Sequence, residues 1–156
     1  MAEKKLLIEQ YELPQLDCKR WGTNKGFTRT ELLRGMLWNV FSKYIRHRDE
    51  GKCISCGEWK NFADLQAGHF APVGGTSVDL WFDEKNVNGE CSTCNADFEG
   101  WHLVPMRKNL VNKYSETIVQ EIEKKKQQKL SVKWEERQYV DLIKYYYAKV
   151  QEYEKN

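Results

Sequence analysis

Four of the five cysteines fall into two CxxC pairs, Cys53 with Cys56 and Cys91 with Cys94, and this arrangement can hold a metal ion. Two intervening residues let one turn present both sulfurs to the same ion, and two such pairs supply the four thiolates of a tetrahedral structural zinc site. Two disulfides are the competing interpretation, but no signal peptide precedes the pairs and Cys18 would have no partner. The spacing therefore favours zinc and a reducing compartment.

A histidine lies between the two pairs, where it could serve phosphodiester hydrolysis. That reaction needs a base that deprotonates water and a cation that neutralises the charge building on the phosphate. His69 is the candidate base, because an unperturbed histidine pKa of about 6.5 leaves the ring largely neutral at working pH. The sequence holds three histidines, so His69 taken alone is equally compatible with a structural role.

Charge is unevenly distributed along the 156 residues, although the net charge is only +2. Lys and Arg outnumber Asp and Glu by 11 to 7 in residues 1–52 and by 12 to 8 in residues 101–156, but are outnumbered by 8 to 2 in residues 53–100. An acidic centre with basic flanks suits a protein that holds a cation centrally and contacts phosphate at its periphery, and ordinary solvated charge explains it equally well. No apolar run approaches the roughly eighteen residues of a membrane span, so we expect a soluble protein.

The elements that would position these residues begin with a long helix. Thr28-Arg29-Thr30-Glu31 fits a capping box, and the apolar residues that follow recur at helical spacing, which predicts a helix over about 30–49. Arg46 and Arg48 fall in its last turn, where cations favour the helix dipole and could equally contact phosphate.

Between the cysteine pairs, residues 62–70 and 79–82 are predicted to form the two strands of a β-hairpin. Ser92 or Thr93 can cap a short helix that runs to about residue 99. A hairpin followed by a helix, with a metal at their junction, is the outline of a ββα-metal finger.

Helical periodicity returns after Pro105, and a last helix is predicted over about 134–154. We therefore expect an α+β fold with a single domain over 28–156, made of a zinc-stapled core over 53–102 and a helical C-terminal extension over 106–155. Residues 1–27 show little periodicity and are predicted to form an irregular N-terminal arm.

The order Gly68-His69, then Asn86, then Asn95 directly after Cys94 resembles the frame of zinc-containing HNH endonucleases, which have a ββα-metal core. The resemblance implies that His69 activates water, that Asn86 tethers the loop that orients the histidine, and that Asn95 binds a catalytic divalent ion, Mg²⁺ or Mn²⁺. Many such enzymes carry an acidic residue or a second histidine where this chain has Gly68. His102 can supply the missing ligand or can simply face solvent, and further candidate ligands are Gln66, Asp97 and Glu99.

A narrower resemblance, to the phage NinG/Rap family, runs from about residue 38 to 150. It rests on the order of four segments in this sequence: 41–49, 67–70, 86–95, and Lys133-Trp134 followed by Tyr145-Tyr146-Tyr147. The family implies a structure-selective DNA endonuclease that acts on branched recombination intermediates such as D-loops and Holliday junctions. It also implies the host cytoplasm as the location, and phage or host recombination proteins as partners.

The remaining expectations concern partners and alternatives. Arg46, Arg48, Arg107 and Lys108 are the candidate phosphate contacts, and symmetric cutting of a four-way junction would favour a homodimer. A non-catalytic zinc module that binds nucleic acid is the alternative function. A dithiol redox protein is disfavoured, because redox CxxC motifs usually occur singly near a βαβ pattern.

Overall fold

The computed structural model describes residues 2–16, 27–72, 78–97, 99–128 and 132–155. These residues form two compact units, one made of Met1–Tyr44 with Trp134–Asn156 and the other of Ile45–Lys133. The predicted single domain over 28–156 therefore contains parts of both units, and its folding as one domain stays a prediction. Cys18 lies outside the described residues.

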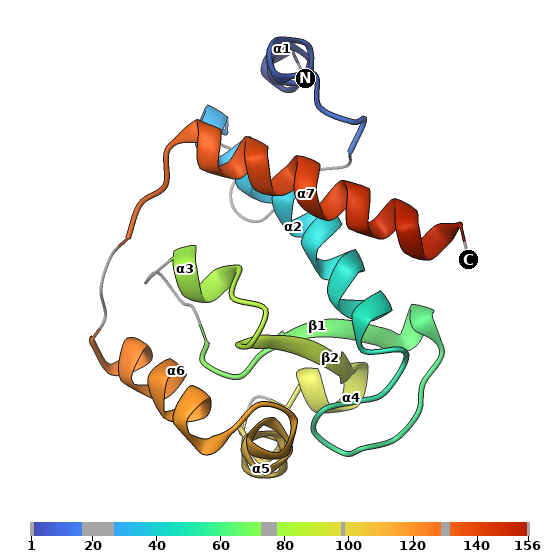
Figure 1. Ribbon diagram of the computed structural model, residues 1–156, viewed down its shortest axis with the longest axis vertical. Helices are drawn as coiled ribbons and strands as arrows, with labels where there is room; N and C mark the ends of the chain where they lie inside the picture. Colours follow the sequence, from blue (N-terminus) through green and yellow to red (C-terminus); the bar gives the residue numbers. More distant parts are fainter. Residues whose placement is uncertain (1, 17–26, 73–77, 98, 129–131, 156) are drawn as a thin grey trace. The chain divides into compact units, whose positions relative to one another are not determined.

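The first unit is built from helices (Figure 1). They are α1 (Ala2–Tyr11), the larger part of α2 (Arg29–Arg48) and α7 (Glu136–Glu154). Helix α1 corrects the expectation of a wholly irregular arm over 1–27. Its weak amphipathic pattern explains the miss, since only Leu7 and Ile8 in it are buried. Polar contacts link the three helices. Glu136 of α7 accepts hydrogen bonds from Tyr11 Oη of α1 at 2.8 Å and from Arg29 Nε of α2 at 2.8 Å.

The two long helices begin as their sequences indicate. The capping box of α2 is confirmed, because the Thr28 backbone N–H donates to Glu31 Oε2 at 2.8 Å and the Glu31 N–H donates to Thr28 Oγ1 at 3.3 Å. The predicted boundaries of α2 and α7 agree with the structure to within two residues. Their apolar faces meet through aromatic rings, and Phe41 packs edge-on against Tyr146 with ring centroids 4.9 Å apart.

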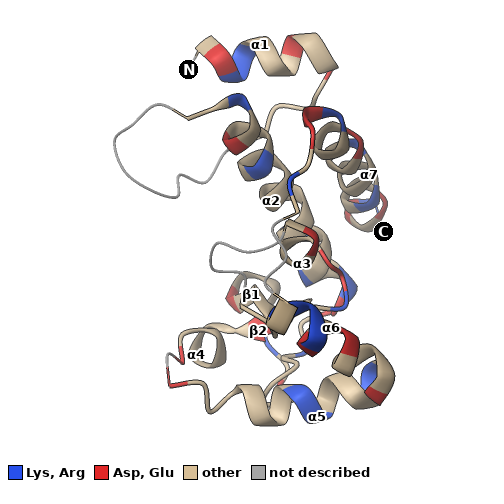
Figure 2. Ribbon diagram, turned by 90° about the vertical axis from the view of Figure 1, so that its left-hand side faces the viewer, with Lys and Arg blue, Asp and Glu red and all other residues tan. Residues whose placement is uncertain are grey.

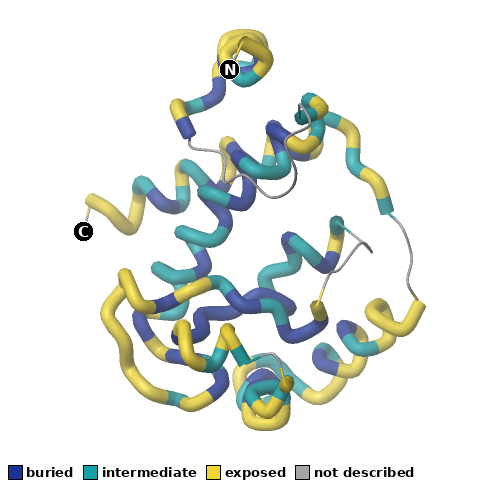
Figure 3. The backbone as a smooth tube through the Cα atoms, turned by 180° about the vertical axis from the view of Figure 1, so that it is seen from behind, coloured by how far each residue is buried: buried dark blue, intermediate teal, exposed yellow. Residues whose placement is uncertain are grey.

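The second unit contains a two-stranded antiparallel sheet, β1 (Leu65–His69) with β2 (Val87–Cys91). The register pairs Leu65 with Cys91 and His69 with Val87. The predicted hairpin partner for β1 was therefore wrong, because residues 78–81 form a short helix, α3 (Val78–Trp81). The sequence of β2 did not predict a strand, because it contains the polar residues Asn88 and Glu90. Both are nevertheless fully buried, as is the rest of β2 (Figure 3).

Three helices complete the second unit. The first, α4 (Ser92–Asn95), follows β2 directly and contacts both strands. Its N-cap is Cys91, without a side-chain cap, where Ser92 or Thr93 had been expected. Helices α5 (Leu103–Lys113) and α6 (Glu116–Gln128) then pack against the stretch after β1 through one apolar cluster: Phe70, Ala71, Leu80, Met106, Leu110, Val119 and Ile122. None of the described helices is long and apolar enough to cross a membrane.

Candidate metal centre and active site

The four paired cysteines converge on one point. The Sγ atoms of Cys53, Cys56, Cys91 and Cys94 all lie within 4.8 Å of one another, and those of Cys56 and Cys91 are 4.0 Å apart. A tetrahedral zinc with Zn–S bonds of about 2.3 Å requires sulfurs separated by about 3.8 Å. None of these cysteines forms a disulfide, so the disulfide interpretation is wrong.

Local backbone geometry presents the sulfurs. The first pair lies in a tight turn in which the Gly57 N–H donates to the Cys53 carbonyl at 2.9 Å, and Gly57 has a φ of 77°. A non-glycine residue disfavours this left-handed conformation. The second pair joins the end of β2 to α4, and the Cys91 N–H donates to the Cys53 sulfur at 3.3 Å. A hydrogen bond from the backbone of the second pair to a sulfur of the first thus holds the two pairs together.

The chemistry of the four sulfurs fits a soft divalent cation. Burial, then the neighbouring sulfurs of Cys91 and Cys53, raise the pKa of Cys94 above its ordinary range. A cation at the centre would offset the repulsion between thiolates that causes part of this shift. Cys53, Cys56, Cys91 and Cys94 are therefore the residues that can hold a structural zinc ion.

His69 ends strand β1, and its ring has a fixed orientation. Its Nε2 lies 3.1 Å from the Trp81 carbonyl oxygen, and the two rings meet edge-on with centroids 6.1 Å apart. A carbonyl oxygen can only accept, so Nε2 carries the proton and Nδ1 carries the lone pair. Burial lowers the pKa of His69 to about 4, against a weaker opposing effect of the Trp81 carbonyl. The ring is therefore neutral at physiological pH.

Asn86 holds the loop that follows His69. Its Oδ1 accepts the Ala71 N–H at 2.7 Å, while its Nδ2 donates to the carbonyls of Ala71 at 3.1 Å and Leu80 at 2.9 Å. The side chain is fully buried, so all three bonds are shielded from water. Asn86 thus joins the segment after β1 to α3, whose Trp81 carbonyl orients His69.

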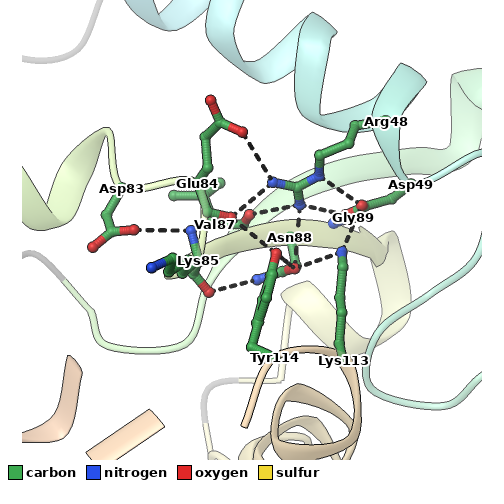
Figure 4. A network of polar contacts seen from close by, with 10 residues as sticks. All are labelled: Arg48, Asp49, Asp83, Glu84, Lys85, Val87, Asn88, Gly89, Lys113 and Tyr114. Carbon is green, nitrogen blue, oxygen red and sulfur yellow. Dashed lines mark hydrogen bonds and ion pairs between the residues drawn. The ribbon is translucent and has the colours of Figure 1, made fainter. Parts of the chain in front are cut away.

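Asn88 has a different set of partners, which Figure 4 shows. Its Oδ1 accepts from Arg48 Nη2 at 3.2 Å, Lys113 Nζ at 2.9 Å and Tyr114 Oη at 3.2 Å. Arg48 also makes a bidentate pair with Asp49, with both nitrogen–oxygen distances at 2.8 Å. This polar network fastens the last turn of α2 to β2 and α5.

The four candidate phosphate contacts are in unlike surroundings. The donors of Arg48 are engaged by Asp49, Asn88 and the carbonyls of Glu84 and Val87. Arg107 lies in α5, whose charged residues are all basic, and it pairs with Glu116 at 2.6 Å and Glu123 at 2.8 Å in α6 (Figure 2).

The other two candidate phosphate contacts, Arg46 and Lys108, have different surroundings from Arg48 and Arg107. The Arg46 guanidinium lies over the Phe62 ring at 4.4 Å, and Lys108 is exposed. Arg48 and Arg107 therefore have internal structural partners, which sequence spacing could not reveal.

A cavity of about 560 Å³ opens beside the first cysteine pair. Basic and amide side chains line it, among them Arg48, Lys52, Asn109 and Lys113. His69 and Asn95 are not among its lining residues, so this cavity is separate from the candidate base.

Of the candidate ligands of a second metal, Asn95 lies beside Gly68. Asn95 Nδ2 donates to Gln66 Oε1 at 2.6 Å, which turns the Asn95 Oδ1 toward the Gly68 backbone. His102 Nδ1 lies 3.3 Å from Asp97 Oδ2, and its Nε2 lies 3.9 Å from Glu90 Oε1. Glu99 instead accepts from the Trp101 ring N–H at 2.8 Å.

Sequence reasoning missed Glu90, a fully buried carboxylate in this group. The signal available was an acidic residue directly before a metal-binding cysteine.

Comparison with known proteins places the chain among phage proteins. The family described as "Bacteriophage Lambda NinG protein" matches residues 27–156. "Protein ninG" of Escherichia phage 933W is 40% identical over 81 residues, which are 51% of this chain and 39% of that protein. "Protein ninG" of Salmonella phage P22 is 38% identical over 81 residues, 51% of this chain and 38% of the relative.

The matched region spans about two fifths of the length of these curated relatives. No solved structure matches the chain. The family match extends over most of the sequence and contains both cysteine pairs, His69 and the helices of the second unit. The chain belongs to the NinG family.

Proposed function

We propose that this protein is a metal-dependent DNA endonuclease of the HNH type that cuts branched recombination intermediates. The observation that carries the proposal is the setting of His69. A neutral imidazole ends β1 with its proton fixed on Nε2 by the Trp81 carbonyl, and Asn86 clamps the loop that follows it. A general base needs an oriented ring with its lone pair on a defined nitrogen, and this setting provides one on Nδ1.

The order of elements around His69 supports the same proposal. Two antiparallel strands are followed by the short helix α4. The four cysteines bring the end of β2 next to the turn that contains Cys53 and Cys56. This is the ββα outline expected of the HNH core, although the second strand and the helix are placed differently from the sequence expectation. Asn95 is the last residue of α4 and directly follows Cys94.

The chain's own groups divide the reaction among them. His69 Nδ1 accepts a proton from water, and the resulting hydroxide attacks the phosphorus while the bond to the leaving oxygen breaks. Asn86 keeps the imidazole in place during this transfer. Asn95 and His102 would hold a divalent ion, which when bound neutralises charge on the scissile phosphate and stabilises the leaving oxygen. The amide oxygen of Asn95, with water oxygens in the remaining positions, suits Mg²⁺ or Mn²⁺.

The substrate class rests on family membership together with the charge pattern. Arg46 and Lys108 are the better candidates for phosphate contact, because Arg48 and Arg107 are held by internal carboxylates. Cutting a four-way junction on two strands would use two active sites, and a homodimer is the simplest source of them.

Cleavage of a labelled four-way junction and its linear control tests the proposal. Zinc-loaded protein and the His69→Ala variant are compared with and without added Mg²⁺, because a chelator would also remove the zinc. We expect cutting of the branched DNA only by the wild type and only with Mg²⁺. His47→Ala is the matched control, since His47 packs against Phe62 with centroids 4.4 Å apart and does not belong to the site.

The same experiment distinguishes the nuclease from the alternative function, a non-catalytic zinc module. Binding of DNA without cleavage on either substrate, by protein that retains its zinc, would refute the nuclease proposal and support a non-catalytic zinc module. Equal cleavage by wild type and His69→Ala would refute the role of the base.

A further inference from the structure

The backbone position before His69 has no side chain of its own, but other side chains fill the space beside it. A Cβ built on Gly68 would lie 2.2 Å from Glu90 Oε2 and 2.9 Å from Asn95 Oδ1. Both oxygens are close to one point, so they are separated by at most the sum of these distances, 5.1 Å. Two oxygen atoms therefore converge where a side chain at position 68 would begin.

Glu90 is in an unusual state for a buried carboxylate. The residue is fully buried, and its Oε1 accepts a hydrogen bond from the Ser55 hydroxyl. Its Oε2 has no hydrogen-bond partner among the described residues. Buried carboxylate oxygens are normally paired with a donor or a cation, so the Oε2 position indicates a missing partner.

His102 approaches the other oxygen of the same carboxylate. Its Nδ1 faces Asp97 Oδ2 at 3.3 Å, and a carboxylate oxygen can only accept, so Nδ1 carries a proton. Its Nε2 lies 3.9 Å from Glu90 Oε1. A carboxylate that orients a histidine in this way is the usual support of a metal-binding imidazole.

Two side-chain oxygens, from Glu90 and Asn95, thus converge beside Gly68, and His102 Nε2 faces the other oxygen of Glu90. We propose that Glu90 is the carboxylate ligand of a divalent cation bound together with Asn95 and His102, in the place that Gly68 leaves without a ligand. This inference deepens the proposed function and rests on it, because it completes the metal site that an HNH-type nuclease requires. Gln66 is a positioning residue, since it accepts from the Asn95 amide at 2.6 Å and so directs the Asn95 oxygen.

Binding of Mn²⁺ to zinc-loaded protein without DNA tests the inference. Titration calorimetry on the wild type should show one Mn²⁺ per chain in addition to zinc, and Glu90→Gln should weaken its affinity by more than about tenfold. Glu121→Gln is the matched control, because Glu121 is exposed on α6 and is not a candidate ligand. Glu121→Gln should bind Mn²⁺ as the wild type does.

Thermal unfolding gives a second readout that a purely structural Glu90 would not produce. Without Mn²⁺, Glu90→Gln should unfold at the same or a higher temperature than the wild type, because the amide removes a buried carboxylate oxygen that lacks a partner. Added Mn²⁺ should raise the unfolding temperature of the wild type alone. A lower unfolding temperature of Glu90→Gln without Mn²⁺, combined with unchanged Mn²⁺ affinity, would overturn the inference.

Moving the carboxylate from position 90 to position 68 provides a second test if Glu90→Gln does not fold. Gly68 does not have a positive φ, so its backbone accepts Asp once the Glu90 carboxylate is removed and the Asn95 side chain, whose Oδ1 would lie 2.9 Å from the new Cβ, shifts slightly. The double variant Gly68→Asp/Glu90→Ala should therefore bind Mn²⁺ within about tenfold of the wild type, while Glu90→Ala alone should not. A folded, zinc-containing double variant that does not bind Mn²⁺, or a wild type that binds none, would overturn the inference.

The inference and the proposed function can fail separately. Mn²⁺ binding that depends on Glu90, by a protein that cuts no DNA, would support the metal site and refute the endonuclease. Cleavage that depends on His69, by a protein whose Mn²⁺ affinity does not change in Glu90→Gln, would give the opposite result.

Discussion

Replacing Asn86 by Ala should weaken both the fold and the catalytic site. The change removes three buried hydrogen bonds, one to the Ala71 N–H and two to the carbonyls of Ala71 and Leu80. Each bond contributes about 1 kcal/mol, and a buried N–H left without a partner costs about 1–3 kcal/mol more. The free energy of unfolding should therefore fall by about 4–6 kcal/mol. A typical domain has about 5–15 kcal/mol in total, so the variant should remain folded but marginal.

Equilibrium urea unfolding of zinc-loaded protein measures this loss, and junction cleavage at low temperature measures the effect on His69. We expect cleavage to fall by about 100-fold, since small displacements of a catalytic group have effects of this size. Asn88→Ala is the control, because Asn88 is equally buried and lies two residues away but bonds to Arg48, Lys113 and Tyr114. It should cost stability without a comparable loss of cleavage.

The replacement Asn86→Asp refines the experiment. Asp keeps an oxygen that can accept the Ala71 N–H but loses both donations to carbonyls, so its stability should lie between those of the wild type and Asn86→Ala. A loss below about 1 kcal/mol for Asn86→Ala, or an equal loss of cleavage in Asn88→Ala, would refute the reasoning that Asn86 orients the base.

Three further predictions concern zinc, pH and charge. Cys53→Ser should abolish zinc binding and unfold the second unit, because a structural zinc site contributes about 10 kcal/mol or more, as checked by metal analysis and circular dichroism. The folded pKa of His69, about 4, lies below the ordinary 6.5, so the unfolded chain takes up a proton first as the pH falls. From pH 7.5 to pH 5 the wild type should therefore lose about 2 kcal/mol of stability relative to His69→Gln in urea titrations, and equal pH slopes would contradict the lowered pKa. Arg48→Gln should destabilise the fold by about 3 kcal/mol or more, because it breaks a largely buried pair with Asp49. Lys108→Gln should instead leave stability unchanged and lower the salt slope of DNA binding by about one unit, and a reversed pattern would show that Arg48 contacts phosphate.

The predictable parts of this protein are those in which local sequence determines the outcome. The CxxC spacing identified four sulfurs that the structure brings together, and the capping box at Thr28 marked the start of α2. Helix α7 was recognisable because its apolar residues recur with helical period over five turns.

The parts that escaped prediction depend on contacts between distant residues. Strand β2 carries two buried polar residues, Asn88 and Glu90, so its sequence lacks the alternation of a half-exposed strand. Residues 78–81 have strand-like composition but form α3, where Leu80 joins the apolar cluster of the second unit. The partners of Arg48 and Arg107 come from carboxylates and carbonyls up to 40 residues away, which no local pattern encodes.

The division of the chain into units has an evolutionary consequence. The second unit is one continuous stretch, Ile45–Lys133, while the first is assembled from the segments on either side of it. Every candidate ligand and the candidate base lie within that stretch, so a single segment of gene encodes the whole reaction centre. Such a segment can be inherited, duplicated or exchanged between genomes as one piece. The flanking helices can then diverge with the target while the chemistry is retained.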